Sequence, residues 1–236
     1  MDQRNLKNLL DFISNYSDIN AICLLLKPNN TRVDVIFKSC LLQLFSHLNK
    51  SAADNILFLY TNTHTPGNSA TILISELNRV RNDNPDINIK HNKQIIYCIN
   101  YKPFTYAVAA SSPNNIELST DLKNDQDIKW KRSNVECKRL LDYICGLSTL
   151  VVNMAPPIGN ERKQDTQRNL GDKQNEITLL MVSESGVEKS TFINAYVNYM
   201  TYDTMDEARD GKIKCLLNEK FTLMDQDTYE LKTIGL

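Results

Sequence analysis

The sequence lacks the features that would assign it at once to a membrane, secreted or metal-binding class. No apolar run approaches the ~18 residues of a membrane-spanning helix, and the N-terminal MDQRNLKN shows no apolar stretch of a secretory signal. The six cysteines form no C-x-x-C pair, the three histidines are scattered, and no Ser/His/Asp or Cys/His order suggests a hydrolase. A net charge of −1 gives no general attraction to nucleic acid. We therefore expect a cytoplasmic protein, without a membrane span or nucleic-acid partner, whose cysteines are reduced and mostly in the core.

The apolar pattern predicts alternating strands and helices. Hydrophobic residues make up 42% of the chain, which is enough for a sizeable core. Continuous apolar runs, typical of strands buried on both faces, predict strands at 21–26, 55–61, 94–99 and 177–182. Helical spacing predicts helices at 5–17, 33–48, 70–80, 129–147 and 190–199. This alternation predicts an α/β fold with a mostly parallel sheet between helices.

Residues 148–175 differ from the rest because they hold two adjacent prolines and then a long polar run. Such a composition predicts a flexible linker, which divides the chain into 1–147, 148–175 and 176–236. After the linker, the acidic stretch 203–210 is typical of a solvated helix face rather than a calcium loop. The short segments 212–217, 220–224 and 229–234 are β-like. The basic side chains of 129–139 also indicate a solvated helix face.

The segment 176–195, EITLLMVSESGVEKSTFINA, has the layout of a phosphate-binding loop: an apolar strand, a polar turn and a helix. Lys189 and Ser190 stand at the consensus positions of G-x-x-x-x-G-K-[ST], whereas Ser183 and Glu188 replace its two glycines. The predicted phosphate-binding residues are Ser183, Glu184, Ser185, Gly186, Val187, Glu188, Lys189, Ser190 and Thr191, with the Ser190 hydroxyl for Mg²⁺. The alternative is a plain strand-turn-helix in which Lys189 is solvated and Ser190 and Thr191 cap the helix.

Two stretches resemble the G domain of translation-factor-class GTPases, closest to the septin/AIG1-like branch. ITLLMVSESGVEKSTFINAYVNYM is similar to a LLLGETGVGKSTFINAFVNYL opening with two glycines lost, and INAICLLLKPNN through LFLYTNTH is similar to the closing half of such a domain. The resemblance covers roughly residues 2–147 and 176–236. It implies a three-layer P-loop NTPase-like sheet with its halves in reversed order, as in a circular permutation. We therefore expect the strand at 177–182 to insert beside the strand at 21–26.

The resemblance also implies a base site and a missing switch segment. It places Asn62 where an asparagine contacts guanine and His64 where an aspartate usually stands, and Asn100 follows the next strand. Each of these positions is also explained by an ordinary turn at the end of a strand. The segments that sense the γ-phosphate would fall before residue 1 and after residue 236, so the resemblance gives no support for hydrolysis.

These observations predict a GTP-binding, G-domain-like protein that binds Mg²⁺·GTP weakly. A carboxylate at Glu188 would repel the phosphates, so weak binding is expected. The alternative is a non-catalytic interaction module, a partial pseudo-GTPase that pairs with itself or with intact relatives. A third possibility is a fragment with no independent role.

Overall fold

The structure is a computed structural model. It describes residues 18–28, 50–67, 69–83, 89–90, 92–151, 176–183, 188–224 and 231–235. The helices predicted at 5–17 and 33–48 and most of the predicted linker (152–175) lie outside these residues. Within them, the α/β character of the chain is confirmed.

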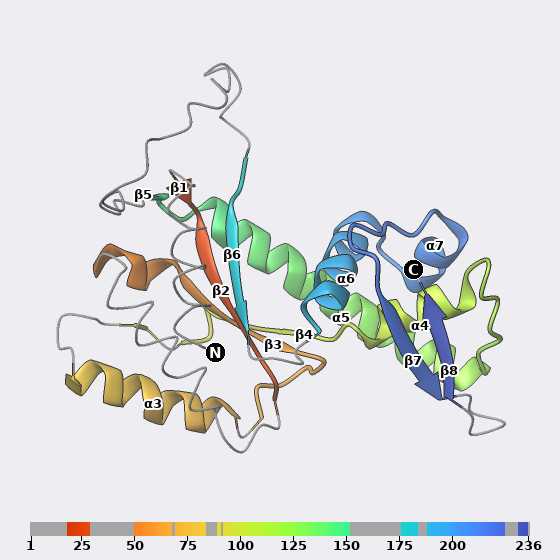
Figure 1. The fold of residues 1–236 in the computed structure, drawn as a ribbon, viewed down its shortest axis with the longest axis horizontal. Helices are drawn as coiled ribbons and strands as arrows, with labels where there is room; N and C mark the ends of the chain where they lie inside the picture. The colour runs from red at the N-terminus through yellow and green to blue at the C-terminus, as the bar shows by residue number, and fades with distance from the viewer. Residues whose placement is uncertain are drawn as a thin grey trace, which may run out of the picture.

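A parallel four-stranded sheet forms the centre of the molecule, in the order β4-β3-β2-β6 (Figure 1). Its strands are β2 (Ala21–Leu26), β3 (Ile56–Thr61), β4 (Ile96–Ile99) and β6 (Leu179–Ser183), close to the predicted ranges. All six residues of β2 and of β3 are buried, as continuous apolar runs predict.

The predicted insertion of the second half beside the first is confirmed at the level of strand pairing. β6 runs parallel to β2, with Ala21 opposite Leu179 and Leu25 opposite Ser183. The Asn20 side chain extends this pairing, since its Oδ1 accepts from the Thr178 N–H at 2.8 Å. Residues more than 150 positions apart therefore share one sheet.

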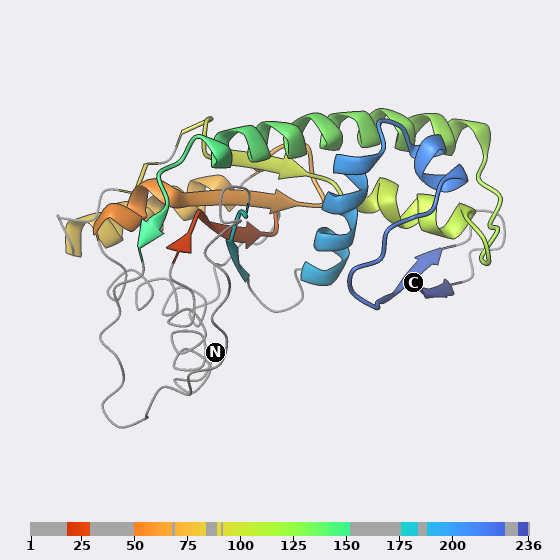
Figure 2. The same cartoon turned by 90° about the horizontal axis from the view of Figure 1, so that it is seen from above.

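Helices connect and flank the sheet. The predicted helices appear as α3 (Ser69–Asp83), α5 (Thr120–Cys145) and α6 (Lys189–Thr201), and a 3-10 helix, η1 (Lys50–Asn55), precedes β3. α5 packs against β4 and continues past the carboxyl end of the sheet, where it meets α4 (Lys102–Ala110), α6 and α7 (Met205–Asp210) (Figure 2). α6 makes its main contacts with α5 and α4 rather than with the sheet.

Several elements differ from the sequence prediction. α5 begins at Thr120, nine residues earlier than predicted, because the Ser119 side chain caps it at the Leu122 N–H. Helix α4 was not predicted. A short antiparallel pair, β1 (Asp18–Ile19) with β5 (Leu150–Val151), places a strand inside the predicted linker.

The C-terminal segment is only partly β-structure. Strands β7 (Lys220–Met224) and β8 (Leu231–Gly235) form an antiparallel pair close to two of the predicted ranges. The prediction of β-structure at 212–217 is wrong, because this segment is irregular. Cys145 and Cys215 are exposed, contrary to a core position, whereas Cys23, Cys98 and Cys137 are buried and all five are free thiols.

Buried asparagines on α6 explain the irregular segment. Asn194 Oδ1 accepts from the Leu216 and Leu217 N–H groups at 2.9 and 3.1 Å, and its Nδ2 donates to Leu217 O at 2.8 Å. Asn198 contacts the backbone of Lys214 in the same way. The two side chains stand in for a neighbouring strand, so the backbone is satisfied without joining a sheet.

Side chains from α5 satisfy the end of α6. Asn134 Nδ2 donates to Tyr199 O and Tyr202 O at 2.6 and 3.1 Å, and the Trp130 indole N–H donates to Tyr202 O at 3.2 Å. The last carbonyls of a helix lack partners within the helix, so these contacts fix α6 against α5. The rings of Trp130 and Tyr199 also meet edge to face, with centroids 4.6 Å apart.

Candidate functional site

The predicted site residues lie at one edge of the sheet, because parallel strands bring their carboxyl ends together. Ser183 ends β6, Asn62 follows β3, and Asn100 follows β4. This edge is where open α/β sheets bind ligands. The phosphate half and the base half of the prediction are separated by β2.

The phosphate half is described at Ser183 and from Glu188 onward, while Glu184, Ser185, Gly186 and Val187 lie outside the described residues. Lys189 is the first residue of α6, and its Nζ donates to Ser183 Oγ at 2.7 Å. The ammonium therefore reaches back to the end of β6. A phosphate would have to draw the lysine away from this hydroxyl.

Glu188 occupies a backbone conformation that favours glycine. Its φ of 39° and ψ of 53° lie in the left-handed region, and its side chain does not cap α6. The consensus glycine that Glu188 replaces therefore falls at a position where a side chain is strained. The carboxylate accepts a hydrogen bond from the hydroxyl of buried Tyr101, and burial followed by this contact raises the pKa of Tyr101.

A second carboxylate, which the sequence analysis did not identify, lies at the same place. Glu219 accepts a hydrogen bond from the Thr191 side chain, and its Oε2 is buried with no hydrogen-bond partner in the described part of the chain. Burial raises the pKa of Glu219 most, the nearby charge of Glu188 adds to this rise, and the Thr191 contact opposes it. Glu219 precedes β7 and is 28 residues beyond Thr191, so no local pattern points to it.

The predicted magnesium ligand Ser190 is half-buried in the first turn of α6. No cluster of three or more His, Cys, Asp or Glu side chains suited to a metal occurs among the described residues. The two carboxylates beside Ser190 place negative charge at the helix N-terminus, where the helix dipole favours an anion. This charge opposes a phosphate at the same position.

The base half contains polar atoms without partners. Asn62 has a φ of 58°, its N–H donates to Ile99 O at 2.9 Å, and its side-chain Oδ1 is buried without a hydrogen-bond partner among the described residues. His64 Nε2 is likewise buried without a hydrogen-bond partner in the described part of the chain. Burial lowers the pKa of His64, and the charges of Arg132 and Lys129 lower it further, so the imidazole is neutral at pH 7.

Asn100 is engaged within the protein. Its Oδ1 accepts from the Lys102 N–H at 3.0 Å, at the start of α4. Its carbonyl accepts from Ser133 Oγ at 3.1 Å and from the Tyr199 hydroxyl at 2.5 Å. These contacts join β4, α4, α5 and α6. They favour the alternative that Asn100 is an ordinary turn residue at the end of a strand.

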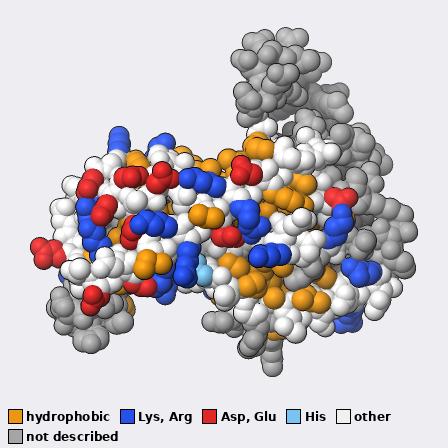
Figure 3. Space-filling model, turned by 180° about the vertical axis from the view of Figure 1, so that it is seen from behind, with side chains coloured by type: hydrophobic (Ala, Val, Ile, Leu, Met, Phe, Trp, Pro, Cys, Tyr) orange, Lys and Arg blue, Asp and Glu red, His pale blue; other side chains and the backbone are white. Residues whose placement is uncertain are grey.

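A groove of about 890 Å³ lies beside the base half, between β4, α5 and the loop after β3. Figure 3 shows the face that carries α5, where Lys and Arg side chains gather beside hydrophobic ones. The groove is lined by His64, Pro66, Asn92, Lys93, Ile96, Cys98, Lys131, Arg132, Val135, Glu136 and Arg139. Among the predicted site residues that the structure describes, His64 alone lines it.

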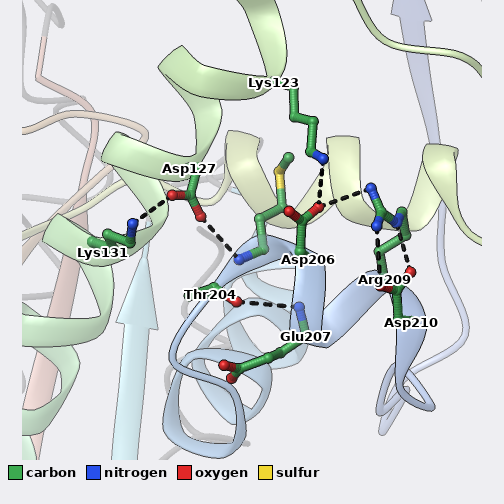
Figure 4. A network of polar contacts seen from close by, with 9 residues as sticks. Lys123, Asp127, Lys131, Thr204, Asp206, Glu207, Arg209 and Asp210 are labelled. Carbon is green, nitrogen blue, oxygen red and sulfur yellow. Dashed lines mark hydrogen bonds and ion pairs between the residues drawn. The ribbon is translucent and has the colours of Figure 1, made fainter. Parts of the chain in front are cut away.

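The acidic stretch 203–210 is paired with basic side chains, most of them from α5 and α7 (Figure 4). Asp206 contacts Lys123 Nζ at 3.0 Å and Arg209 Nη1 at 2.8 Å. Asp203 pairs with Lys138, and Asp210 pairs with Arg209. The exposed position of these carboxylates agrees with the predicted solvated face, and the ion pairs are a further feature that the sequence did not predict.

No protein-family model, curated protein or solved structure matches this chain. In the part of the chain that the structure describes, no helix is both long and apolar enough to cross a membrane.

Proposed function

We propose that the protein binds a guanine nucleotide weakly at the carboxyl edge of the sheet and does not hydrolyse it. The observation that carries the proposal is the parallel pairing of β6 with β2, which brings Ser183 and Lys189 to the same edge as Asn62 and His64. The phosphates would lie at the N-terminus of α6, where backbone N–H groups and Lys189 favour an anion. Asn62 and His64 would contact the base.

The two carboxylates account for the weakness of the proposed binding. Glu188 and Glu219 would face the phosphates, and two unit charges ~4 Å apart repel by about 4 kcal/mol at an effective dielectric near 20. Mg²⁺ would supply positive charge that offsets this repulsion, and oxygen ligands such as the Ser190 hydroxyl suit it. The proposal assigns no residue of the described part of the chain to orient water, so we expect the bound nucleotide to remain intact.

Fluorescent GTP and ATP titrations, with and without Mg²⁺, test the proposal. We expect GTP to bind more tightly than ATP, and Glu188→Gly to strengthen GTP binding about tenfold. Glu188→Gln removes the charge while keeping the side chain, so it separates repulsion from backbone strain. Glu117→Gln, which removes an exposed carboxylate from the loop before α5, is the matched control. Unchanged affinity in both Glu188 variants would count against the proposal.

The second candidate function is a non-catalytic interaction module. The groove on the α5 side favours it, because an apolar floor with a charged rim is typical of a binding surface. A protein that captures a partner but shows no nucleotide binding would support this function over the first.

A further inference from the structure

We propose that the groove between β4 and α5 binds a short, extended acidic peptide that carries apolar side chains. This proposal builds on the second candidate function, the interaction module, and names the class of partner that it binds. Peptide binding in the groove would not require a bound nucleotide.

The floor of the groove is apolar. Ile96 and Cys98 from β4 and Pro66 from the loop after β3 line one side, and Val135 from α5 lines the other. The Val135 side chain is 61% exposed although it is β-branched and apolar. Ile128, which is 54% exposed, lies seven residues earlier on the same face of α5, with the cations of Lys131 and Arg132 between the two apolar side chains.

The rim of the groove is positively charged. Lys93, Lys131, Arg132 and Arg139 line it, against one carboxylate, Glu136. Lys131 pairs with Asp127 and Arg139 pairs with Glu136, but Lys93 and Arg132 form no ion pair among the described residues. The chain as a whole carries a net charge of −1, so this positive surface is a local feature that suits an acidic partner.

His64 gives a second, independent sign of a ligand. Its Nε2 is buried at the groove and has no hydrogen-bond partner in the described part of the chain. The cations of α5 keep the ring neutral, since Arg132 and Lys129 lower its pKa after burial does. A peptide carboxylate in the groove would face these cations and accept a hydrogen bond from the imidazole.

The shape of the groove and the edge of β4 favour an extended peptide. From Lys131 to Arg139, α5 rises about 12 Å, which roughly four extended residues would cover. Phe58 N–H donates to Ile95 O and Asn62 N–H donates to Ile99 O, so the backbone groups of Ile96 and Cys98 point away from β3. Arg139 Nη2 donates to Ile96 O at 2.5 Å, so this carbonyl already has a partner. No strand pairs with this outer edge in the described part of the sheet, so a peptide in the groove would pair with the outward N–H and C=O of Cys98.

Fluorescence anisotropy with three labelled hexapeptides tests the proposal. One peptide alternates Glu with Leu, the second alternates Lys with Leu, and the third alternates Glu with Ser. We expect the Glu/Leu peptide to bind about tenfold or more tightly than either of the others, because only it satisfies both the rim and the floor. Its affinity should fall as salt is added, since the rim is exposed.

Variants of exposed residues localise the binding. Lys93→Glu combined with Arg132→Glu reverses the charge of the rim and should lower the peptide affinity about tenfold or more. Val135→Asp places a charge on the apolar floor and should lower the affinity by a similar factor. Lys102→Glu, at the exposed start of α4, is the charge-matched control and should change the affinity less than about twofold. Circular dichroism and the urea midpoint show that each variant is folded.

Two outcomes overturn the proposal. They are equal binding of the three peptides and unchanged affinity in a folded rim-reversal variant. His64 lines the groove and also belongs to the proposed base site, so competition between GTP and the peptide is expected through this side chain. Loss of GTP binding in Lys189→Ala with peptide binding intact would show that peptide binding does not require the phosphate half.

Discussion

Buried polar side chains occur both at the junction, where α6 packs against α5 and the segment 214–217, and at the carboxyl edge of the sheet, but most of their hydrogen bonds differ. At the junction, Asn134, Asn194 and Asn198 each contact backbone groups that lack partners in a helix or sheet, and the Tyr196 hydroxyl is an exception without a partner among the described residues. At the edge, Asn62 Oδ1, His64 Nε2 and Glu219 Oε2 have no hydrogen-bond partner in the described part of the chain.

The backbone shows the same contrast. Asn62 and Glu188, both at the edge, have positive φ angles, whereas none of the residues of α6 does. Unsatisfied polar atoms and a strained backbone cost stability, and proteins concentrate such costs where a ligand binds. The hydrogen bonds of the junction therefore give its asparagines a structural role, and the unsatisfied groups at the edge agree with the binding that we propose there.

The largest effect is expected at the junction, from Asn194→Ala. The substitution removes three contacts to Leu216 and Leu217 and leaves buried backbone groups without partners. We expect the free energy of unfolding in urea to fall by about 3 kcal/mol. Asn124→Ala, at an exposed position of α5, should change it by less than about 0.5 kcal/mol. Similar losses in both variants would remove the distinction between the two regions.

Two tyrosines on α6 allow a matched comparison of a satisfied and an unsatisfied hydroxyl. The Tyr199 hydroxyl donates to Asn100 O at 2.5 Å, whereas the buried Tyr196 hydroxyl has no partner among the described residues. Tyr199→Phe should lower the free energy of unfolding by about 1.5 kcal/mol, and Tyr196→Phe should leave it within about 0.5 kcal/mol or raise it. The reverse order in urea denaturation would contradict the hydrogen-bond assignment.

Backbone strain at the edge is tested by Glu188→Gly. Glycine accepts a φ of 39° without a Cβ penalty, so we expect the free energy of unfolding to rise by about 1 kcal/mol. Glu188→Ala removes the carboxylate but keeps the Cβ, so its free energy of unfolding should rise less than that of the glycine variant. Thermal and urea unfolding measure both variants. If alanine stabilises the protein as much as glycine does, charge rather than strain explains the gain.

The smallest effect concerns His64, and its sign follows from the lowered pKa. The folded pKa lies below the ordinary value of 6.5, so the unfolded chain binds the proton more tightly. Stability is therefore full above pH 6.5 and falls as the pH drops toward the folded pKa, below which the loss is complete. The groups that set this shift, besides burial, are Arg132, Lys129, Asp125 and Glu136, all on α5.

His64→Asn removes the titrating group and isolates its contribution. Urea denaturation at pH 7.5 and pH 5.5 (about one pH unit on each side of the ordinary pKa) measures the loss of stability between them. This loss should be smaller in the variant than in the unmodified protein. Equal losses would show that His64 is not held neutral by its surroundings.

The sheet was largely predictable from local sequence. The apolar runs gave the four strands to within two residues, and the family resemblance correctly predicted the pairing of β6 with β2. Helix α4 was missed because most of its residues are buried, so its sequence lacks an alternation between apolar and polar faces. The irregular segment near Leu216 was predicted as β-like because its apolar residues suggest a strand, whereas Asn194 and Asn198 supply its backbone partners.

The candidate site was predictable only in part. The spacing of the phosphate-loop motif identified Lys189 and the position of Glu188. The resemblance to a G domain identified Asn62 and His64. Glu219 and the groove were not predictable, because they depend on side chains that β7, β4 and α5 bring together from distant parts of the chain.

The sequence by itself determined the alternation of strands and helices and the place of Lys189 at the start of α6, because apolar periodicity and loop chemistry are local properties. Only the tertiary structure decided which polar groups find a partner. Asn194 has hydrogen-bond partners because the segment near Leu216 folds against it, whereas Asn62 Oδ1 has none among the described residues, although both are ordinary asparagines in the sequence. Hydrogen-bond satisfaction depends on the atoms that the fold places within about 3 Å of each group.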